Sequence, residues 1–248
     1  MVSREKLYVL VFVLLSALRY TNRMKLVMTG GGDSKHFREI DKFFVNKLGK
    51  NPSLFFIPLA GKKRSWKNAL TRIQETFSTI EFDNIEACED LHSLTWEKLK
   101  SFDAIYIDGG NTFQLMDMIR DTHFYELLHR FLNCGGVVNG DSAGAIVLGS
   151  HIETAHFGLH GDENKAGVIS YQGLNLIGNW AVHCHYKKRE DKEILKFVLE
   201  YGFPVIALHE TSSVFVNNRT LKVLGKRPIA IFTKKGKKIV EVGESFRL

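Results

Sequence analysis

Cysteine is scarce in this chain: its 248 residues include only Cys88, Cys134 and Cys184, an odd number of widely separated thiols. This spacing does not fit the paired framework of a disulfide-rich scaffold, and it gives none of the close pairs that bind zinc. Internal repeats and low-complexity segments are also absent. With 44% apolar residues, the chain is long enough to bury a substantial core, so it fits one enzyme-sized domain.

The usual phosphate-binding motifs are missing as well. A glycine triplet, Gly30–Gly32, follows the apolar run Lys25–Thr29 and precedes a helix predicted over residues 36–48. The triplet lacks the full G-x-G-x-x-G spacing and the P-loop lysine. The geometry of a strand-to-helix turn therefore explains it better than the alternative hypothesis of a nucleotide-binding module.

Acidic residues are fewer than basic residues, so the formal net charge is +7. The basic clusters lie at residues 62–64, 187–189 and 234–238. No aromatic-interleaved nucleic-acid motif accompanies them, so we predict no nucleic-acid partner and interpret the clusters as solvated faces. The same positive field would favour an acidic peptide substrate.

No apolar run is long enough for a stable membrane span. Arg4 and Lys6 precede the apolar segment Leu7–Leu18, which is too short to span and has no clean small-x-small cleavage site. We therefore expect residues 1–23 to be an extension or a signal-like segment, and residues 24–248 to be a single α/β domain. The expected location is cytoplasmic, with secretion as the alternative if the segment is a signal peptide.

Strand and helix patterns alternate through the first half of the chain. Apolar strands are predicted at residues 25–29, 54–58, 81–87 and 104–108, with helices at 36–48 and 65–77. Alternating segments with turns, typical of antiparallel strands, follow at 214–216, 221–224, 229–232 and 238–242. These patterns predict an α/β fold with a mostly parallel sheet flanked by helices and antiparallel strands toward the C-terminus.

The run Gly140-Asp141-Ser142-Ala143-Gly144 follows a short apolar strand and leads directly into the apolar residues 145–148. A strand that breaks on small residues and passes at once into a helix is the geometry of a nucleophile elbow. Ser142 is therefore the candidate nucleophile. The alternative is a plain strand-to-helix turn, because short G-x-S-x-G matches arise by chance.

A serine nucleophile needs a base and an acid that orients the base. His183 and His185 alternate in an extended stretch, so we expect both to lie on one face of a strand, with Cys184 pointing away into the core. Glu210 follows the predicted strand 204–208, at the edge where α/β sheets place their sites. Either histidine could be the base; the alternative is a structural histidine and a solvated glutamate.

Backbone donors for an oxyanion are also available. The predicted strand 104–108 breaks at Gly109-Gly110 before a helix, and this turn can present amides to the elbow. We predict the N–H groups of Gly110 and Ala143 as the donors. Simple turn chemistry, with Asn111 or Thr112 capping the next helix, is the alternative.

These motifs, in this order, resemble those of the peptidase E (aspartyl dipeptidase) family of serine peptidases, which includes the cyanophycinases. The residues concerned are Gly109–Leu115, Gly140–Ala145, His185-Tyr186 and His209-Glu210. The similarity runs from about Met24 to the C-terminus. It implies a glutamine-amidotransferase-like sheet with serine in place of cysteine at the elbow, and a peptidase domain over residues 24–248.

The resemblance implies roles for individual residues. They are Ser142, His185 and Glu210 as the catalytic triad, Gly110 and Ala143 as oxyanion donors, and Asn111 and Arg189 as substrate-binding residues. His185 is preferred to His183 because an aromatic residue, Tyr186, follows it directly, as in the family. Arg189 falls where a family arginine receives the aspartate side chain of the substrate, and a solvated arginine at the start of the next helix is the alternative.

One position departs from the family pattern: Asp141 precedes the nucleophile, where peptidase E typically has tryptophan. The function expected from the resemblance is a serine-type exopeptidase that hydrolyses short peptides such as N-terminal aspartyl dipeptides. It would require no metal and no organic cofactor, and its partner would be a small peptide substrate. A cyanophycinase-like peptidase and a catalytically silent binding protein on the same fold are the alternatives.

Overall fold

The computed structural model describes residues 24–32, 38–78, 82–159 and 161–248. The prediction for residues 1–23 lies outside the described residues. Among the helices that are described, none is long and apolar enough to cross a membrane.

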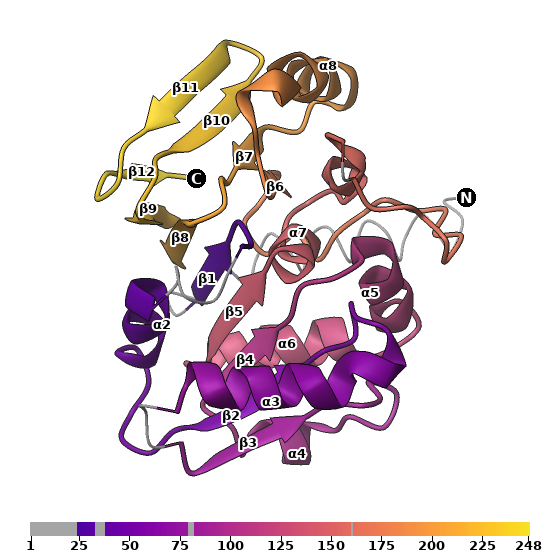
Figure 1. Ribbon diagram of the computed structural model, residues 1–248, viewed down its shortest axis with the longest axis vertical. Helices are drawn as coiled ribbons and strands as arrows, with labels where there is room; N and C mark the ends of the chain where they lie inside the picture. Colours follow the sequence, from indigo (N-terminus) through magenta and orange to yellow (C-terminus); the bar gives the residue numbers. More distant parts are fainter. Residues whose placement is uncertain (1–23, 33–37, 79–81, 160) are drawn as a thin grey trace, which may run out of the picture.

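A mixed sheet with eight strands in the described residues forms the centre of the molecule (Figure 1). Its parallel part runs in the order β1-β5-β4-β2-β3, and the antiparallel strands β8, β9 and β12 continue it beyond β1. The strands are β1 (Lys25–Thr29), β2 (Ser53–Ile57), β3 (Asn84–Ala87), β4 (Ala104–Ile107), β5 (Val137–Asp141), β8 (Ser212–Asn217), β9 (Thr220–Gly225) and β12 (Ser245–Arg247). The predicted fold class is confirmed.

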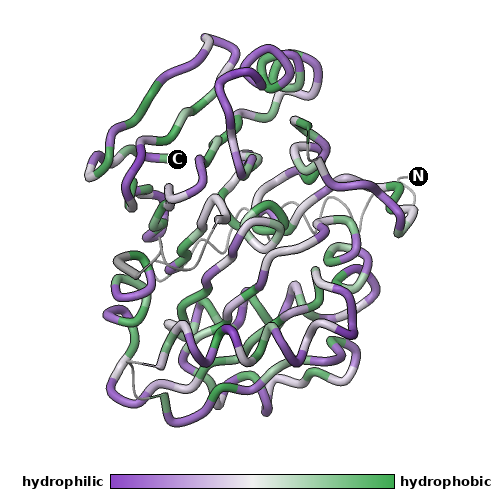
Figure 2. The backbone as a smooth tube through the Cα atoms, in the orientation of Figure 1, coloured by the Kyte–Doolittle hydropathy of each residue, from purple (hydrophilic) through white to green (hydrophobic). Residues whose placement is uncertain are grey.

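Both faces of the parallel part are buried, because successive residues of a strand point to opposite faces. In β2, Leu54 and Phe56 join the core on one face, whereas Phe55 and Ile57 join the core on the other. Such strands need a helical layer on each side, which explains their nearly continuous apolar sequences. Figure 2 shows the alternation of hydrophilic and hydrophobic residues along the helices that supply these layers.

Two sets of helices cover the sheet. One face packs on α2 (Arg38–Val45) and α3 (Trp66–Thr76), which contribute Phe44 and Ile73 to its core. The other face packs on α4 (Trp96–Leu99), α5 (Thr112–Ile119), α6 (Phe124–Asn133) and α7 (Ala143–Leu148). The sequence patterns did not predict α4 and α6.

A second sheet of four strands stands beside the first in the described part of the chain, with the order β11-β10-β7-β6. Its strands are β6 (Ala181–His183), β7 (Val205–Ala207), β10 (Ile229–Thr233) and β11 (Gly236–Val240), and α8 (Asp191–Tyr201) packs against it. The tail strands predicted from the sequence are therefore divided: β8 and β9 extend the first sheet, and β10 and β11 complete the second. In Figure 1 this second unit lies above β1 and β8.

Candidate active site

Ser142 stands at a sharp turn between β5 and α7, with a positive φ of 48°. A positive φ costs a non-glycine residue about 1–2 kcal/mol, so the surrounding structure must hold it. The flanking glycines permit the close approach: a Cβ at Gly140 would lie 2.6 Å from the Gly144 oxygen, and one at Gly144 would lie 2.2 Å from the Ile107 oxygen. The elbow predicted from the sequence has the expected geometry.

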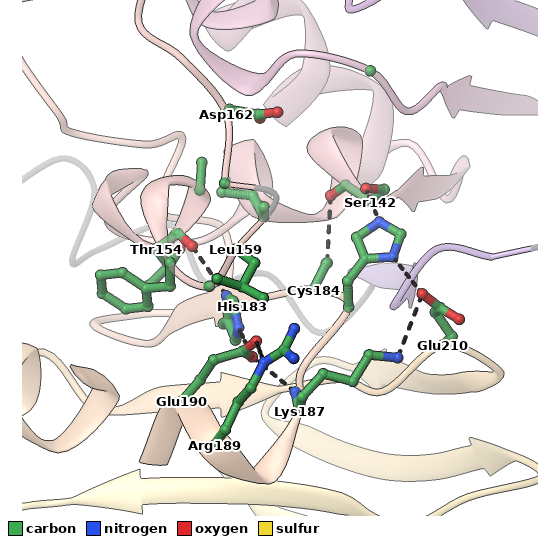
Figure 3. A pocket seen from close by; sticks show the side chains of 17 residues that line it. Ser142, Thr154, Leu159, Asp162, His183, Cys184, Lys187, Arg189, Glu190 and Glu210 are labelled. Carbon is green, nitrogen blue, oxygen red and sulfur yellow. Dashed lines mark hydrogen bonds and ion pairs between the residues drawn. The ribbon is translucent and has the colours of Figure 1, made fainter. Parts of the chain in front are cut away.

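His185 reaches this serine from the second sheet. Its Nε2 lies 2.8 Å from Ser142 Oγ, within hydrogen-bonding distance (Figure 3). The prediction that His183 and His185 share one face of a strand is wrong, because β6 ends at His183 and His185 adopts a φ of 55°. The backbone N–H of His185 donates to the Gly30 oxygen at 3.0 Å, and this contact with the turn after β1 turns the imidazole toward the elbow.

Glu210 lies beyond the end of β7 and meets the other ring nitrogen: its Oε1 is 3.3 Å from His185 Nδ1. Lys187 Nζ lies 3.6 Å from the same oxygen. Burial opposes ionisation of this carboxyl, but the hydrogen bond with His185 and the charge of Lys187 outweigh it and lower the pKa of Glu210. The structure thus brings the predicted serine, histidine and glutamate together in one chain of contacts.

His183, the other candidate base, contacts different groups. Its ring nitrogens lie 3.0 Å from the Thr154 oxygen and 3.1 Å from Glu190 Oε2, and its side chain is buried. Cys184 also points inward, with its Sγ 3.5 Å from the Ser142 oxygen. Burial raises the pKa of the Cys184 thiol well above its ordinary value, which leaves the sulfur unreactive.

The predicted oxyanion turn faces the elbow. Gly110 has a φ of 144° and lies so close to the turn after β2 that a Cβ there would be 2.4 Å from the Ala60 oxygen. Gly110 and Ser142 line the same cavity, and Ala143 is the first residue of α7. The first N–H groups of a helix have no partner within it, so the position of Ala143 suits the donor role predicted for it.

Asn111 is the N-cap of α5: its Oδ1 accepts a hydrogen bond from the Gln114 amide at 2.9 Å. Its Nδ2 donates to the Glu163 oxygen at 3.0 Å. The capping role considered from the sequence is thus present. Both ends of the amide serve protein contacts, and Asn111 is not among the residues that line the cavity, so its substrate-binding role stays a prediction.

The cavity at this site has a volume of about 320 Å³. Arg189, whose side chain is 56% exposed, lies on its wall in the turn η4 (Lys188–Glu190), before α8 begins. Lys187 lies on the same wall, and Asp162 lies on the opposite side in Figure 3. Two cationic side chains therefore line the same cavity as the candidate nucleophile.

Gly31 has a role at the site that the sequence pattern does not indicate. A Cβ at this position would lie 2.3 Å from Cε1 of His185 and 2.5 Å from its Nε2. The glycine therefore leaves space that the imidazole fills. The triplet Gly30–Gly32 is consistent with the predicted turn, but nothing in its spacing indicates that the turn supports a histidine 154 residues later.

A group of carboxyls lies on the α2 and α3 side of the elbow. Thr29 Oγ1 donates to Asp141, and burial raises the pKa of Asp141 to about 6. Burial, and then the nearby charge of Asp141, raise the pKa of Asp41 to about 7. Asp108 is paired with Arg72 at 2.6 Å. Asp141, which departs from the family pattern, thus belongs to this group and does not line the cavity.

A serine, an imidazole and a carboxylate in hydrogen-bonding sequence, beside a glycine turn, are the arrangement that serine hydrolases use. Comparison with known proteins gives a narrower result. Residues 26–224 match the model of peptidase family S51. The chain belongs to peptidase family S51 and is a serine peptidase.

Individual proteins that resemble this chain are also peptidases by name. The chain is 26% identical to peptidase E of Nostoc sp. over 207 residues, which cover 79% of this chain and 80% of that protein. It is 26% identical to peptidase E of Shewanella denitrificans over 208 residues, covering 79% of this chain and 85% of that protein. A crystal structure of a peptidase from an acI-B1 Actinobacterium is similar, with a TM-score of 0.71 and 20% identity, covering 93% of this chain and 100% of that one.

Proposed function

We propose that this chain is a serine exopeptidase that hydrolyses short peptides through Ser142, His185 and Glu210. The observation that carries the proposal is the continuous line of contacts among the three side chains. Ser142 Oγ lies 2.8 Å from His185 Nε2, and His185 Nδ1 lies 3.3 Å from Glu210 Oε1. These distances permit the proton transfers that acyl transfer to a serine requires.

In the proposed mechanism, Ser142 Oγ attacks the carbonyl carbon of the peptide bond while His185 Nε2 takes its proton. The N–H groups of Gly110 and Ala143 donate to the oxyanion, and Glu210 stabilises the imidazolium. His185 then protonates the leaving amine, and an acyl-enzyme remains on Ser142. A water molecule, activated by the same imidazole, releases the acid product and restores the serine.

The proposed substrate is a short peptide with an N-terminal acidic residue, such as an aspartyl dipeptide. A cavity of about 320 Å³ lies at the small end of the range for ligand pockets, which suits a short peptide. Arg189 and Lys187 lie on its wall, and a guanidinium suits a carboxylate because it can form two parallel hydrogen bonds. Peptidase E is also the name of the relatives described above.

Replacement of the nucleophile tests the mechanism. Ser142→Ala is expected to lower kcat for an aspartyl dipeptide by about 10³-fold or more, because the remaining groups provide only oxyanion stabilisation and binding. A fluorophosphonate probe is expected to label the wild type and to leave the variant unlabelled. An unlabelled wild type without turnover would identify a silent binding protein and refute the proposal.

A dipeptide panel tests the substrate. Arg189→Ala is expected to remove the preference for aspartyl over alanyl dipeptides. Lys188→Ala is the matched control, because Lys188 belongs to the same exposed turn and does not line the cavity. An aspartyl preference that is equal in the wild type and in Arg189→Ala would exclude the role of Arg189, and a wild type without this preference would exclude the acidic-substrate assignment. Hydrolysis of cyanophycin in the same panel would favour a cyanophycinase-like peptidase.

A further inference from the structure

The turn that follows the candidate base carries the cations of the cavity. The chain leaves His185, passes Lys187 and forms the turn η4, which ends at Glu190 where α8 begins. Lys187 and Arg189 point toward the cavity, whereas the Glu190 side chain is buried, with 6% of its surface exposed. A buried carboxylate needs partners to offset its lost hydration. The partners of Glu190 therefore indicate which parts of the cavity wall it connects.

Glu190 bonds to its own turn. Its Oε2 accepts a hydrogen bond from the Lys187 backbone N–H at 2.8 Å, and its Oε1 lies 3.8 Å from Arg189 Nε. Burial opposes ionisation, but hydrogen bonds from His183 and the Lys187 amide outweigh it and lower the pKa of Glu190. The carboxylate therefore stays ionised and stabilises the turn that carries Lys187 and Arg189.

His183 connects this carboxylate to another part of the cavity wall, at Thr154. Its Nε2 lies 3.1 Å from Glu190 Oε2, and its Nδ1 lies 3.0 Å from the Thr154 backbone oxygen. These two contacts connect Glu190 to the turn η3 (Glu153–His156) through a buried ring, because only 4% of the His183 side chain is exposed.

The loop after η3 leaves space for the Glu190 side chain. Gly158 has a φ of 79°, and a Cβ there would lie 2.6 Å from Glu190 Oε1. Thr154, Gly158, His183 and Glu190 all line the cavity that Ser142 lines. The carboxylate therefore contacts the segment 187–189, the strand β6 and the loop after η3. Figure 3 shows its contacts with Lys187, Arg189 and His183.

We propose that Glu190 is a positioning residue: through His183 and the Lys187 amide it fixes Lys187 and Arg189 around the cavity and thereby sets the affinity for an acidic substrate residue. The inference rests on the proposed function, because it assumes that these cations meet the substrate carboxylate. Glu190 acts on binding through its neighbours and touches neither the nucleophile nor the base. A loss of positioning should therefore raise KM and leave kcat almost unchanged.

Glu190→Gln tests this directly, because glutamine keeps an oxygen for the Lys187 amide but removes the charge that faces His183 and Arg189. We expect KM for an aspartyl dipeptide to rise about tenfold, since small displacements of positioning groups have effects of this order or larger. At neutral pH, where Glu210 is ionised even if Lys187 moves away from it, we expect kcat, the rate of fluorophosphonate labelling and KM for an alanyl dipeptide to stay within about twofold. Glu200→Gln, on the exposed end of α8, is the matched control.

The outcomes separate this inference from the proposed function. Failure of the wild type to hydrolyse either dipeptide would refute the proposed function itself. With wild-type turnover present, an unchanged KM in Glu190→Gln, or equal losses for both dipeptides, would overturn the positioning role alone. If Glu190→Gln does not fold, Glu190→Asp and His183→Gln decide the question: a selective rise in KM for the aspartyl dipeptide supports the role, and its absence in both refutes it.

Discussion

The contact between Gly31 and His185 predicts that one methyl group on the first turn disables the site. In Gly31→Ala the new Cβ would lie 2.3 Å from Cε1 and 2.5 Å from Nε2 of His185. Carbon atoms normally pack about 3.5–4.0 Å apart, so the ring must move by roughly 1 Å. The 2.8 Å contact with Ser142 cannot survive such a movement unchanged. A displacement of this size costs about 10²-fold in rate, and we expect that loss in kcat/KM.

Backbone strain must be separated from this collision. Gly31 has a φ of 79°, so alanine there also costs about 1–2 kcal/mol of stability. Gly167 is a matched control, because its φ is 70° and nothing lies within 4 Å of a Cβ built on it. Urea unfolding should show similar destabilisation of Gly31→Ala and Gly167→Ala, while hydrolysis and fluorophosphonate labelling should fall only in Gly31→Ala. Equal activity in the two variants would refute the steric argument.

Two further predictions concern charge. Lys187→Met should raise the pKa of Glu210, because it removes the cation 3.6 Å from Oε1 of that residue. The acid limb of the kcat/KM profile should then move to higher pH. An unchanged acid limb would exclude an effect of Lys187 on Glu210. Asp41 has a pKa raised from 3.8 to about 7, so between these pH values it is protonated in the folded state and ionised in the unfolded chain. Its contribution to folding stability therefore falls as pH rises from about 4 to 7. Asp41→Asn should therefore gain at most about 4 kcal/mol over the wild type in denaturant unfolding at pH 8 and little at pH 4, and an equal gain at both would contradict the assignment.

The sequence predicted those parts of the candidate site that directly follow an apolar strand. The apolar strands before Gly109, Ser142 and Glu210 could be predicted, and the carboxyl ends of strands in α/β sheets converge on one region. The meeting of Gly109 and Ser142 could therefore be expected without any knowledge of distances, whereas Glu210 follows a strand of the second sheet, which the patterns did not separate from the first. The fold class followed in the same way from alternating strand and helix patterns, although the amphipathic helix α6 was overlooked.

Sequence patterns do not predict backbone conformations that depend on contacts with distant parts of the chain. Alternation along an extended strand predicted one face for His183 and His185, but the positive φ of His185 accompanies a hydrogen bond to Gly30, far away in the chain. Periodicity describes only local geometry, so it could not reveal that contact. The division of the tail between two sheets is of the same kind, because the alternation in β8 and in β10 is equally compatible with either sheet.

The site lies on the junction of the two sheets, and this explains why its parts come from such distant segments. Ser142 ends a strand of the first sheet, while His185 and Glu210 follow neighbouring strands of the second. The turn after β1 joins them: the Thr29 oxygen accepts from the Ser142 amide at 3.1 Å, and the Gly30 oxygen accepts from the His185 amide at 3.0 Å. Consecutive carbonyls at the end of β1 thus hold the candidate nucleophile and the candidate base. The distance between Ser142 and His185 is set by backbone hydrogen bonds, so substitutions that tilt one sheet against the other should impair hydrolysis even where they touch neither side chain.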